Sequence, residues 1–164
     1  MCYTAPMLKT NAMRLLDKAQ VPYEAHEYSA DPMAADFGQR VAAVLGLEPA
    51  RTFKTLVLTG GAEGHFVCCL PVLANLDLKK AASAAGAKRA ELLPIKDLQR
   101  LTGYVRGGCT PIGLKRPLPV IFDATASQGA VIGISSGTCG LMLTVAAEPL
   151  LAMLGAREAD LQAL

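Results

Sequence analysis

The sequence contains no tryptophan and few other aromatic residues, although 52% of its 164 residues are hydrophobic. Phenylalanine and tyrosine make up 5% of the chain, so aliphatic side chains must fill its interior. This length is sufficient for one core, and no linker, internal repeat or low-complexity segment divides the chain. We therefore expect one domain, residues 1–164.

Long hydrophobic runs are absent as well. No apolar stretch reaches the roughly 18 residues that a membrane-spanning helix requires. The amino end lacks the charged start, apolar centre and small-residue cleavage site of a signal peptide. These absences predict a soluble, cytoplasmic protein with no membrane partner.

Residues that ligate metals are scarce. The chain has two histidines, His26 and His65, and five cysteines without CxxC spacing. An odd number of cysteines argues against a disulfide framework, and the adjacent Cys68 and Cys69 would point to opposite faces of a strand. We expect no metal and no cofactor.

Charge is unevenly distributed, although the net charge is only +2. Residues 79–116 carry nine Lys or Arg and two acidic residues, whereas the rest of the chain carries seven basic and twelve acidic residues. A block of one sign can attract an anionic partner, but an ordinary solvated helix face gives the same pattern.

Hydrophobic spacing, together with glycine and proline signals, predicts short helices and strands in irregular alternation. We expect helices over 10–20, 36–45, 78–85, 94–101 and 148–154, and strands over 23–28, 53–59, 66–72, 118–122, 130–134 and 141–145. Several connections are too short for a parallel crossover. The pattern favours an α+β fold with a curved, mixed and partly antiparallel central sheet flanked by helices.

The least core-like stretch is residues 103–113, which read GYVRGGCTPIG. Its adjacent Gly107 and Gly108 indicate a backbone with positive φ or a close approach. Such a loop can turn N–H groups outward to bind a phosphate or a carbonyl oxygen, and a tight turn before the next strand is the alternative. The neighbouring Cys109 would need an activating base to be a nucleophile, so we interpret it as a semi-buried loop residue.

Lys54 and two aromatic residues are further candidates. In an extended strand, Lys54 shares a face with Leu56 and Leu58, so it either snorkels at the end of the sheet or reaches an anion in a pocket. Tyr28 and Phe37 are either core residues or the walls of a pocket for a base or ribose.

Residues 133–137, GISSG, formally match the G-x-S-x-G nucleophile elbow. That motif requires a helix after the serine and a histidine later in the chain. Here another predicted strand follows, and both histidines precede Ser135. We therefore reject a serine hydrolase, although Ser135 could donate a hydrogen bond to a ligand at the end of its strand.

Five segments together carry a resemblance to a known family. They are FKTL at 53–56, LDLKK at 76–80, GYVRGGCTPIG at 103–113, LPVIFD at 118–123 and ISSG at 134–137. In this order and at these separations, they resemble the YbaK-type aminoacyl-tRNA deacylases, relatives of the editing domain of prolyl-tRNA synthetase. The resemblance extends from about residue 10 to residue 156.

The resemblance implies a function and a chemistry. The cysteine-specific branch of the family removes cysteine from tRNA(Pro), and the thiol of the substrate itself is the nucleophile, which gives a cyclic thiolactone. No protein nucleophile or metal is then required. A deacylase for another small amino acid, such as alanine on tRNA(Pro), and a non-enzymatic module that binds aminoacyl-tRNA or a synthetase are the alternatives.

The resemblance also implies roles for individual residues. Lys54 would hold the 3′ end of the tRNA, and the backbone at Gly107 and Gly108 would orient the aminoacyl carbonyl. The other residues implied to line or serve the pocket are Tyr28, Phe37, Thr55, Arg106 and Ser135. A domain of this size has little surface for reading a whole tRNA, so we expect a synthetase partner, and the resemblance implies that it is prolyl-tRNA synthetase.

Family members often carry two basic residues and one acidic residue after the late strand. Here Thr138, Cys139 and Met142 stand at those positions. This difference predicts a change in the grip on tRNA or in the polarity of the pocket.

Overall fold

The computed structural model describes residues 9–164. Cys2 and the first part of the amino end, for which no signal peptide is expected, lie outside these residues. The helices are α1 (Asn11–Lys18), α2 (Phe37–Leu45), α3 (Leu78–Ala85), α4 (Ile95–Thr102) and α5 (Ala147–Leu154). The strands are β1 (Tyr23–Glu27), β2 (Phe53–Thr59), β3 (His65–Pro71), β4 (Glu91–Leu92), β5 (Val120–Asp123), β6 (Val131–Ser135), β7 (Leu141–Ala146) and β8 (Arg157–Ala159).

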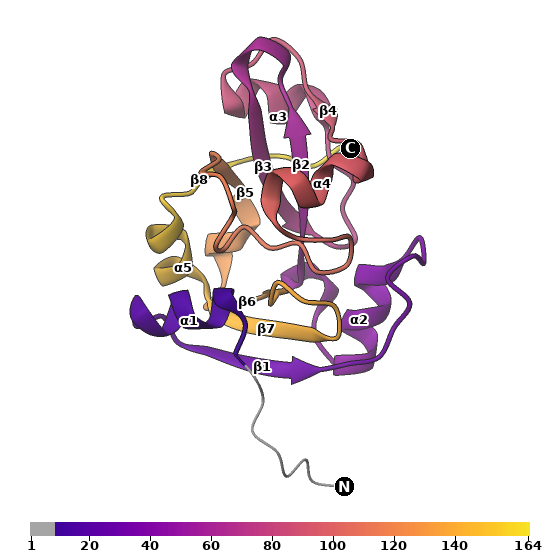
Figure 1. Ribbon diagram of the computed structural model, residues 1–164, viewed down its shortest axis with the longest axis vertical. Helices are drawn as coiled ribbons and strands as arrows, with labels where there is room; N and C mark the ends of the chain where they lie inside the picture. The colour runs from indigo at the N-terminus through magenta and orange to yellow at the C-terminus, as the bar shows by residue number, and fades with distance from the viewer. Residues whose placement is uncertain (1–8) are drawn as a thin grey trace, which may run out of the picture.

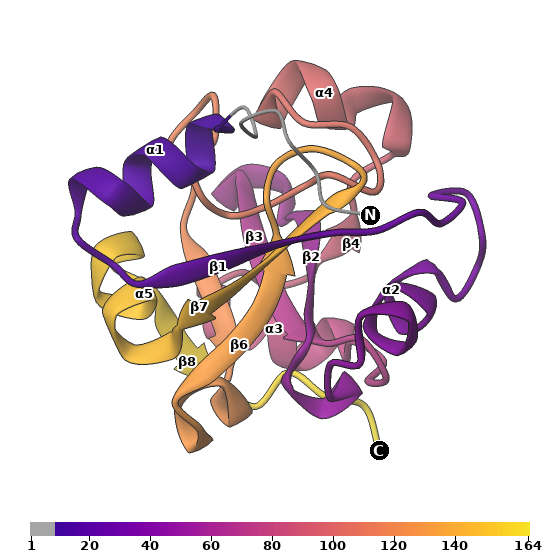
Figure 2. The ribbon, with the colours of Figure 1, turned by 90° about the horizontal axis from the view of Figure 1, so that it is seen from below.

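The strands form two separate sheets, one of three strands and one of five (Figures 1 and 2). The sheet β1-β7-β6 is antiparallel. The sheet β4-β2-β3-β5-β8 is mixed, because β2 pairs antiparallel with β3 and β4, whereas β5 pairs parallel with β3 and β8. A parallel bridge between Thr52 and Gly133 joins the two sheets near the start of β2. The predicted α+β class with mixed strands is confirmed, with the strands divided between two sheets.

All predicted helices and strands are present, and their ends differ by at most two residues from the prediction. The signals at helix ends act as expected. The Thr10 hydroxyl accepts a hydrogen bond from the Met13 N–H at 3.2 Å, and Gly46 and Gly86 end their helices with φ of 68° and 75°. The prediction missed β4 and β8, which are too short to show a periodic pattern and exist through pairing with β2 and β5.

Two hydrophobic clusters cover the two faces of the larger sheet. The first cluster lies between the sheets and includes Phe53 and Val57 of β2, together with buried residues of α1 and α5. The second cluster packs Leu58 of β2 against Ala81 and Ala82 of α3. Successive residues of β2 therefore face different parts of the molecule, as the strand alternation requires. In both views α1 and α5 lie on one side of the sheets and α2 on the other.

Candidate functional site

A cleft of about 360 Å³ opens beside the first half of β2. It is lined by residues from the end of β1, from α2, β2, β6 and β7, and from the segments 72–75 and 106–109. Seven of the eight residues singled out from the sequence line this cleft: Tyr28, Phe37, Lys54, Thr55, Arg106, Gly107 and Ser135. The fold thus gathers residues that are separated by more than 100 positions in the chain.

Lys54 is half-buried in the cleft, on the face of β2 that also carries Leu56 and Leu58. Its ammonium donates a hydrogen bond to the carbonyl of Ala74 at 2.5 Å. Burial lowers the pKa of Lys54 from its usual value. None of the ion pairs among residues 9–164 involves Lys54. A half-buried ammonium whose hydrogen-bond partner among residues 9–164 is a neutral carbonyl oxygen favours an anionic ligand.

Thr55 follows Lys54 and faces the opposite side of β2. Its hydroxyl lies 3.7 Å from the thiol of Cys69 on β3, close to the first cluster. Two adjacent residues therefore reach the cleft from different faces of one strand, with one charged and the other neutral. This arrangement provides a cationic part and a neutral part within one site.

Gly107 is required by both its conformation and its neighbours. Its φ is 89°, and a Cβ added there would lie 2.6 Å from Cβ of Pro32 and 3.6 Å from the ring of Phe37. The backbone of the loop can therefore approach the wall of the cleft only if this residue is glycine. The loop is a turn and also lines the cleft, and ligand binding by its N–H groups stays a prediction.

Gly108 is the predicted residue that does not line the cleft. It is buried, and an added Cβ would lie 3.1 Å from the backbone nitrogen of Cys139. Its N–H donates to the carbonyl of Val105 at 3.0 Å, so it closes the turn. Within residues 9–164 the backbone N–H groups of Arg106, Gly107 and Cys109, which all line the cleft, donate to no acceptor.

Tyr104 holds the loop in shape and was missed by the sequence reasoning. Its hydroxyl donates to the carbonyl of Ile112 at 2.5 Å and also contacts the carbonyl of Gly113 at 3.2 Å. A Cβ added at Gly137 would lie 2.9 Å from the Tyr104 ring, so this side chain also packs against the loop after β6. A tyrosine within a glycine-rich loop was the available signal, because its hydroxyl needs a partner when buried.

Tyr28 and Phe37 form the aromatic wall. Their ring centroids are 6.0 Å apart with an interplanar angle of 56°, a usual geometry for an aromatic pair. Both are partly exposed and belong to neither hydrophobic cluster, which favours the wall over the core interpretation. Burial raises the pKa of Tyr28, so its hydroxyl remains a hydrogen-bond donor at neutral pH.

The lining offers no activated nucleophile. The Ser135 hydroxyl accepts from the N–H of Gly137 at 3.3 Å, and no histidine lines the cleft. Burial raises the pKa of the Cys109 thiol to about 12, so this residue is protonated and semi-buried, as predicted. The carboxylate among the lining residues, Asp36, accepts from Nε of Arg40 at 2.6 Å.

Arg106 is exposed at the rim of the cleft and takes part in no ion pair of the described chain.

Across residues 9–164, no three His, Cys, Asp or Glu side chains converge in a way that would hold a metal ion. Over the same residues, none of the helices combines the length and apolar character needed to cross a bilayer.

The fold and the cleft define an aminoacyl-tRNA editing domain. The model of this family matches residues 31–163, and the chain belongs to the family. The resemblance inferred from the sequence motifs is thereby confirmed.

Individual relatives extend this assignment. A curated protein of Enterococcus faecalis, named "Putative Cys-tRNA(Pro)/Cys-tRNA(Cys) deacylase EbsC", is 41% identical over 155 residues, which cover 93% of each chain. A solved structure titled "Crystal structure of a putative trans-editing enzyme for prolyl tRNA synthetase" matches with a TM-score of 0.79 at 24% identity, over 94% of this chain and 99% of that one. The structure of hypothetical protein APE2540 matches with a TM-score of 0.81 at 20% identity, over 92% and 97%. The two structures support the fold.

Proposed function

We propose that this protein is a trans-editing deacylase that releases cysteine from Cys-tRNA(Pro), and also from Cys-tRNA, by cleaving the aminoacyl ester. The observation that carries the proposal is one cleft that combines a half-buried cation, a glycine turn whose Gly107 and Cys109 N–H groups donate to no acceptor among residues 9–164, and no activated nucleophile. The name of the 41% identical relative supports the same substrate. The expected place of action is the cytoplasm, where aminoacyl-tRNA is used.

The thiol of the substrate supplies the nucleophile in this mechanism. Its sulfur forms a bond to the ester carbonyl carbon, the bond from that carbon to the ribose oxygen breaks, and the thiol proton ends on the released ribose hydroxyl. The products are uncharged tRNA and a cyclic cysteine thiolactone, which water then opens. The protein contributes orientation and fixed hydrogen-bond donors to the developing oxyanion.

The N–H groups of Gly107 and Cys109 are the donors that we assign to the carbonyl oxygen. Both belong to residues that line the cleft, and neither is used by a backbone or side-chain acceptor among residues 9–164. Ser135, at the end of β6, supplies a hydroxyl to the same region. Tyr28 and Phe37 form the wall against which the terminal nucleoside packs.

The phosphate backbone is assigned to the other side of β2. Lys54 carries the cation nearest the reacting ester, and a groove of about 400 Å³ along α3 is lined by Lys79, Lys88 and Arg89 with no acidic residue. These three cations are exposed and take part in no ion pair of the described residues. They are the part of the basic segment 79–116 that we assign to sequence-independent phosphate contacts. Prolyl-tRNA synthetase is the partner expected to supply tRNA identity.

One experiment tests the proposal. The pure protein is incubated with labelled Cys-tRNA(Pro), Ala-tRNA(Pro) and Ser-tRNA, beside the Lys54→Ala variant. We expect rapid loss of cysteine and little loss of alanine or serine, because replacing the thiol removes the nucleophile. Equal rates on all three would overturn the thiol mechanism and favour a deacylase for other small amino acids. Binding of tRNA without turnover of any substrate would favour a non-enzymatic module.

A further inference from the structure

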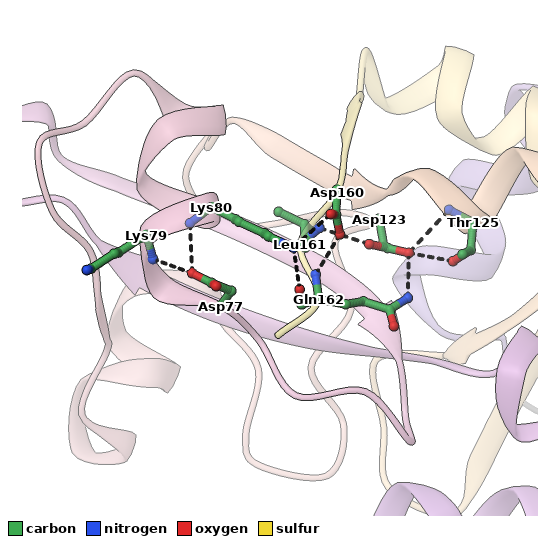
Figure 3. Close-up of polar contacts among 8 residues, drawn as sticks. All are labelled: Asp77, Lys79, Lys80, Asp123, Thr125, Asp160, Leu161 and Gln162. Carbon is green, nitrogen blue, oxygen red and sulfur yellow. Dashed lines mark hydrogen bonds and ion pairs between the residues drawn. The ribbon is translucent and has the colours of Figure 1, made fainter. Parts of the chain in front are cut away.

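The last residues of the chain lie along the segment that leads into α3 (Figure 3). The N–H of Asp77 donates to the carbonyl of Leu161 at 2.8 Å, and the N–H of Ala163 donates to the carbonyl of Asn75 at 2.8 Å. Leu76 and Gln162 form an antiparallel bridge. We call residues 160–163 the C-terminal strap.

Lys80 adds a side-chain link between α3 and the strap. Its ammonium donates to the carboxylate of Asp160 at 2.8 Å and to the carbonyl of Gln162 at 2.7 Å. The side chain of Leu161 is fully buried in the second hydrophobic cluster. Packing and hydrogen bonds thus connect the strap to both α3 and the larger sheet.

Asp123, the last residue of β5, is the polar anchor of the strap. It is 2% exposed, and one carboxylate oxygen accepts from the N–H of Leu161 at 2.9 Å. The other oxygen accepts from the Gln162 side-chain amide at 2.9 Å and from the hydroxyl and N–H of Thr125 at 2.6 and 3.2 Å. Figure 3 shows the donors from Leu161 and Gln162 on one side and those from Thr125 on the other.

The charge state of Asp123 agrees with this arrangement. Burial acts to raise the pKa of Asp123, but the hydrogen bonds from Thr125, Leu161 and Gln162 outweigh burial and leave the pKa below its usual value. The group is a carboxylate at neutral pH, so both oxygens act as acceptors. An asparagine could offer only one acceptor atom to these four donors.

The strap is connected to Lys54 through residues 74 and 75. The carbonyl that accepts from Lys54 belongs to Ala74, one residue before Asn75, which the strap holds. Leu73 and Asn75 themselves line the cleft. Hydrogen bonds, joined by the short backbone stretches 161–163 and 74–75, therefore connect a buried carboxylate on β5 with the ammonium on β2.

We propose that Asp123 is a positioning residue for Lys54: it fixes the C-terminal strap, and the strap fixes the carbonyl of Ala74 that orients the ammonium toward the substrate. The C-terminal residues then contribute to the editing site by positioning Lys54. The consequence for catalysis rests on the proposed function, whereas the effect on Lys54 itself does not.

The test compares Asp123→Ala with Val145→Ala. Val145 is fully buried on β7, pairs with Tyr23 and Ile132, and lies outside the cleft lining, so its truncation lowers stability without touching the strap. Variants are compared after their melting temperatures are measured. The two readouts are kcat and KM on Cys-tRNA(Pro), and the pH midpoint for labelling of Lys54 by an amine-reactive ester, followed by mass spectrometry. The other charged residues that line the cleft are Asp36 and Arg106.

For Asp123→Ala we expect kcat/KM to fall roughly tenfold or more, mainly through KM, because a misplaced group costs one to two orders of magnitude. The labelling midpoint of Lys54 should move to higher pH, since a loosened lysine is better solvated. Val145→Ala should leave the midpoint unchanged. The same midpoint and the same kcat/KM in both variants would overturn the proposal.

If Asp123→Ala does not fold, Gln162→Ala tests the same idea, because it removes one hydrogen bond from Asp123 and keeps the backbone contacts of the strap. A smaller upward shift of the Lys54 midpoint is expected, and no shift counts against the proposal. Failure of the wild-type protein to deacylate any substrate would instead refute the proposed function, and the labelling measurement would still test the positioning of Lys54.

Discussion

The two faces of β2 present different chemistry to one cleft. On the face toward the first hydrophobic cluster, Thr55 lies near the thiol of Cys69, and the neutral glycine turn completes the surroundings. On the face toward α3, Lys54 carries a half-buried positive charge. In the proposed function, the neutral face receives the aminoacyl ester and the charged face receives the RNA backbone. Alternation along a single strand would then be enough to separate amino-acid recognition from RNA recognition.

The largest expected effect is on the charged face. Lys54→Ala should lower kcat/KM on Cys-tRNA(Pro) by roughly 30-fold or more. The variant removes the ammonium that we assign to a phosphate of the bound tRNA, and loss of one partner of a buried charge pair costs about 2–5 kcal/mol. The effect should appear mainly in KM, since the phosphate contact exists in both ground state and transition state. Steady-state deacylation kinetics measure it.

Lys54→Met serves as the control, because it keeps the packing of the side chain without the charge. It should match Lys54→Ala in activity and be at least as stable as the wild type, since it removes the burial of an ammonium. Full activity in Lys54→Met would assign the role of this residue to packing and erase the distinction between the two faces.

The pH dependence of stability and of tRNA binding tests the charge that distinguishes the Lys54 face from the Thr55 face. The pKa of Lys54 is lowered in the folded protein, so the unfolded chain binds more protons between that pKa and 10.5. The destabilisation by Lys54 is therefore complete at low pH and is relieved as pH rises through this window. Denaturant unfolding of wild type and Lys54→Met should converge in stability toward pH 10.5. Binding of uncharged tRNA should lose its Lys54-dependent part over the same window, and parallel pH profiles of the two proteins would contradict this account.

The neutral face depends on Gly107. Gly107→Ala should lower kcat/KM roughly tenfold, because the loop must move away from Pro32 by more than a few tenths of an ångström, and small displacements of orienting groups are costly. It should also destabilise the protein by about 1–2 kcal/mol through its positive φ. Kinetics and denaturant unfolding measure the two effects.

Gly46→Ala is the matched control for this variant. Its φ of 68° imposes a similar backbone cost, yet an added Cβ would meet nothing within 4 Å and the residue does not line the cleft. It should lose stability and retain activity. Equal loss of activity in both variants would mean that stability, rather than the shape of the turn, limits the reaction.

Sequence reasoning succeeded where the determining contacts are local. The helix that ends at Gly46 and the strand that carries Lys54 follow from periodicity and glycine signals within a few residues. It gave no signal where the determining contact is distant. Gly108 faces the backbone of Cys139 rather than the cleft, and Asp123 meets its partners about 40 residues later in the chain. No pattern along the sequence specifies which side of a turn or which buried carboxylate will meet these distant partners.

A smaller effect is expected in the groove along α3. Lys88→Ala and Arg89→Ala should each weaken binding of tRNA a few-fold and reduce the slope of log affinity against log salt by roughly 0.7–0.9 for each phosphate that is no longer neutralised. Lys18→Ala, at the end of α1 and outside the cleft and groove linings, is the control and should change neither quantity. Fluorescence anisotropy titrations at several salt concentrations measure both. Unchanged slopes in the groove variants would confine RNA binding to the cleft.

The smallest effect concerns the support of the glycine turn. Tyr104→Phe keeps the ring that packs against Gly137 and removes the hydroxyl that bonds to the carbonyls of Ile112 and Gly113. We expect a loss of about 1 kcal/mol in the free energy of unfolding, because the two carbonyls lose a buried donor. Activity on Cys-tRNA(Pro) should fall only slightly, since the turn that offers the N–H groups of Gly107 and Cys109 is also closed by the Gly108–Val105 hydrogen bond. A large loss of activity at unchanged stability would instead assign the Tyr104 hydroxyl to the substrate, and would extend the neutral face of the site beyond the turn.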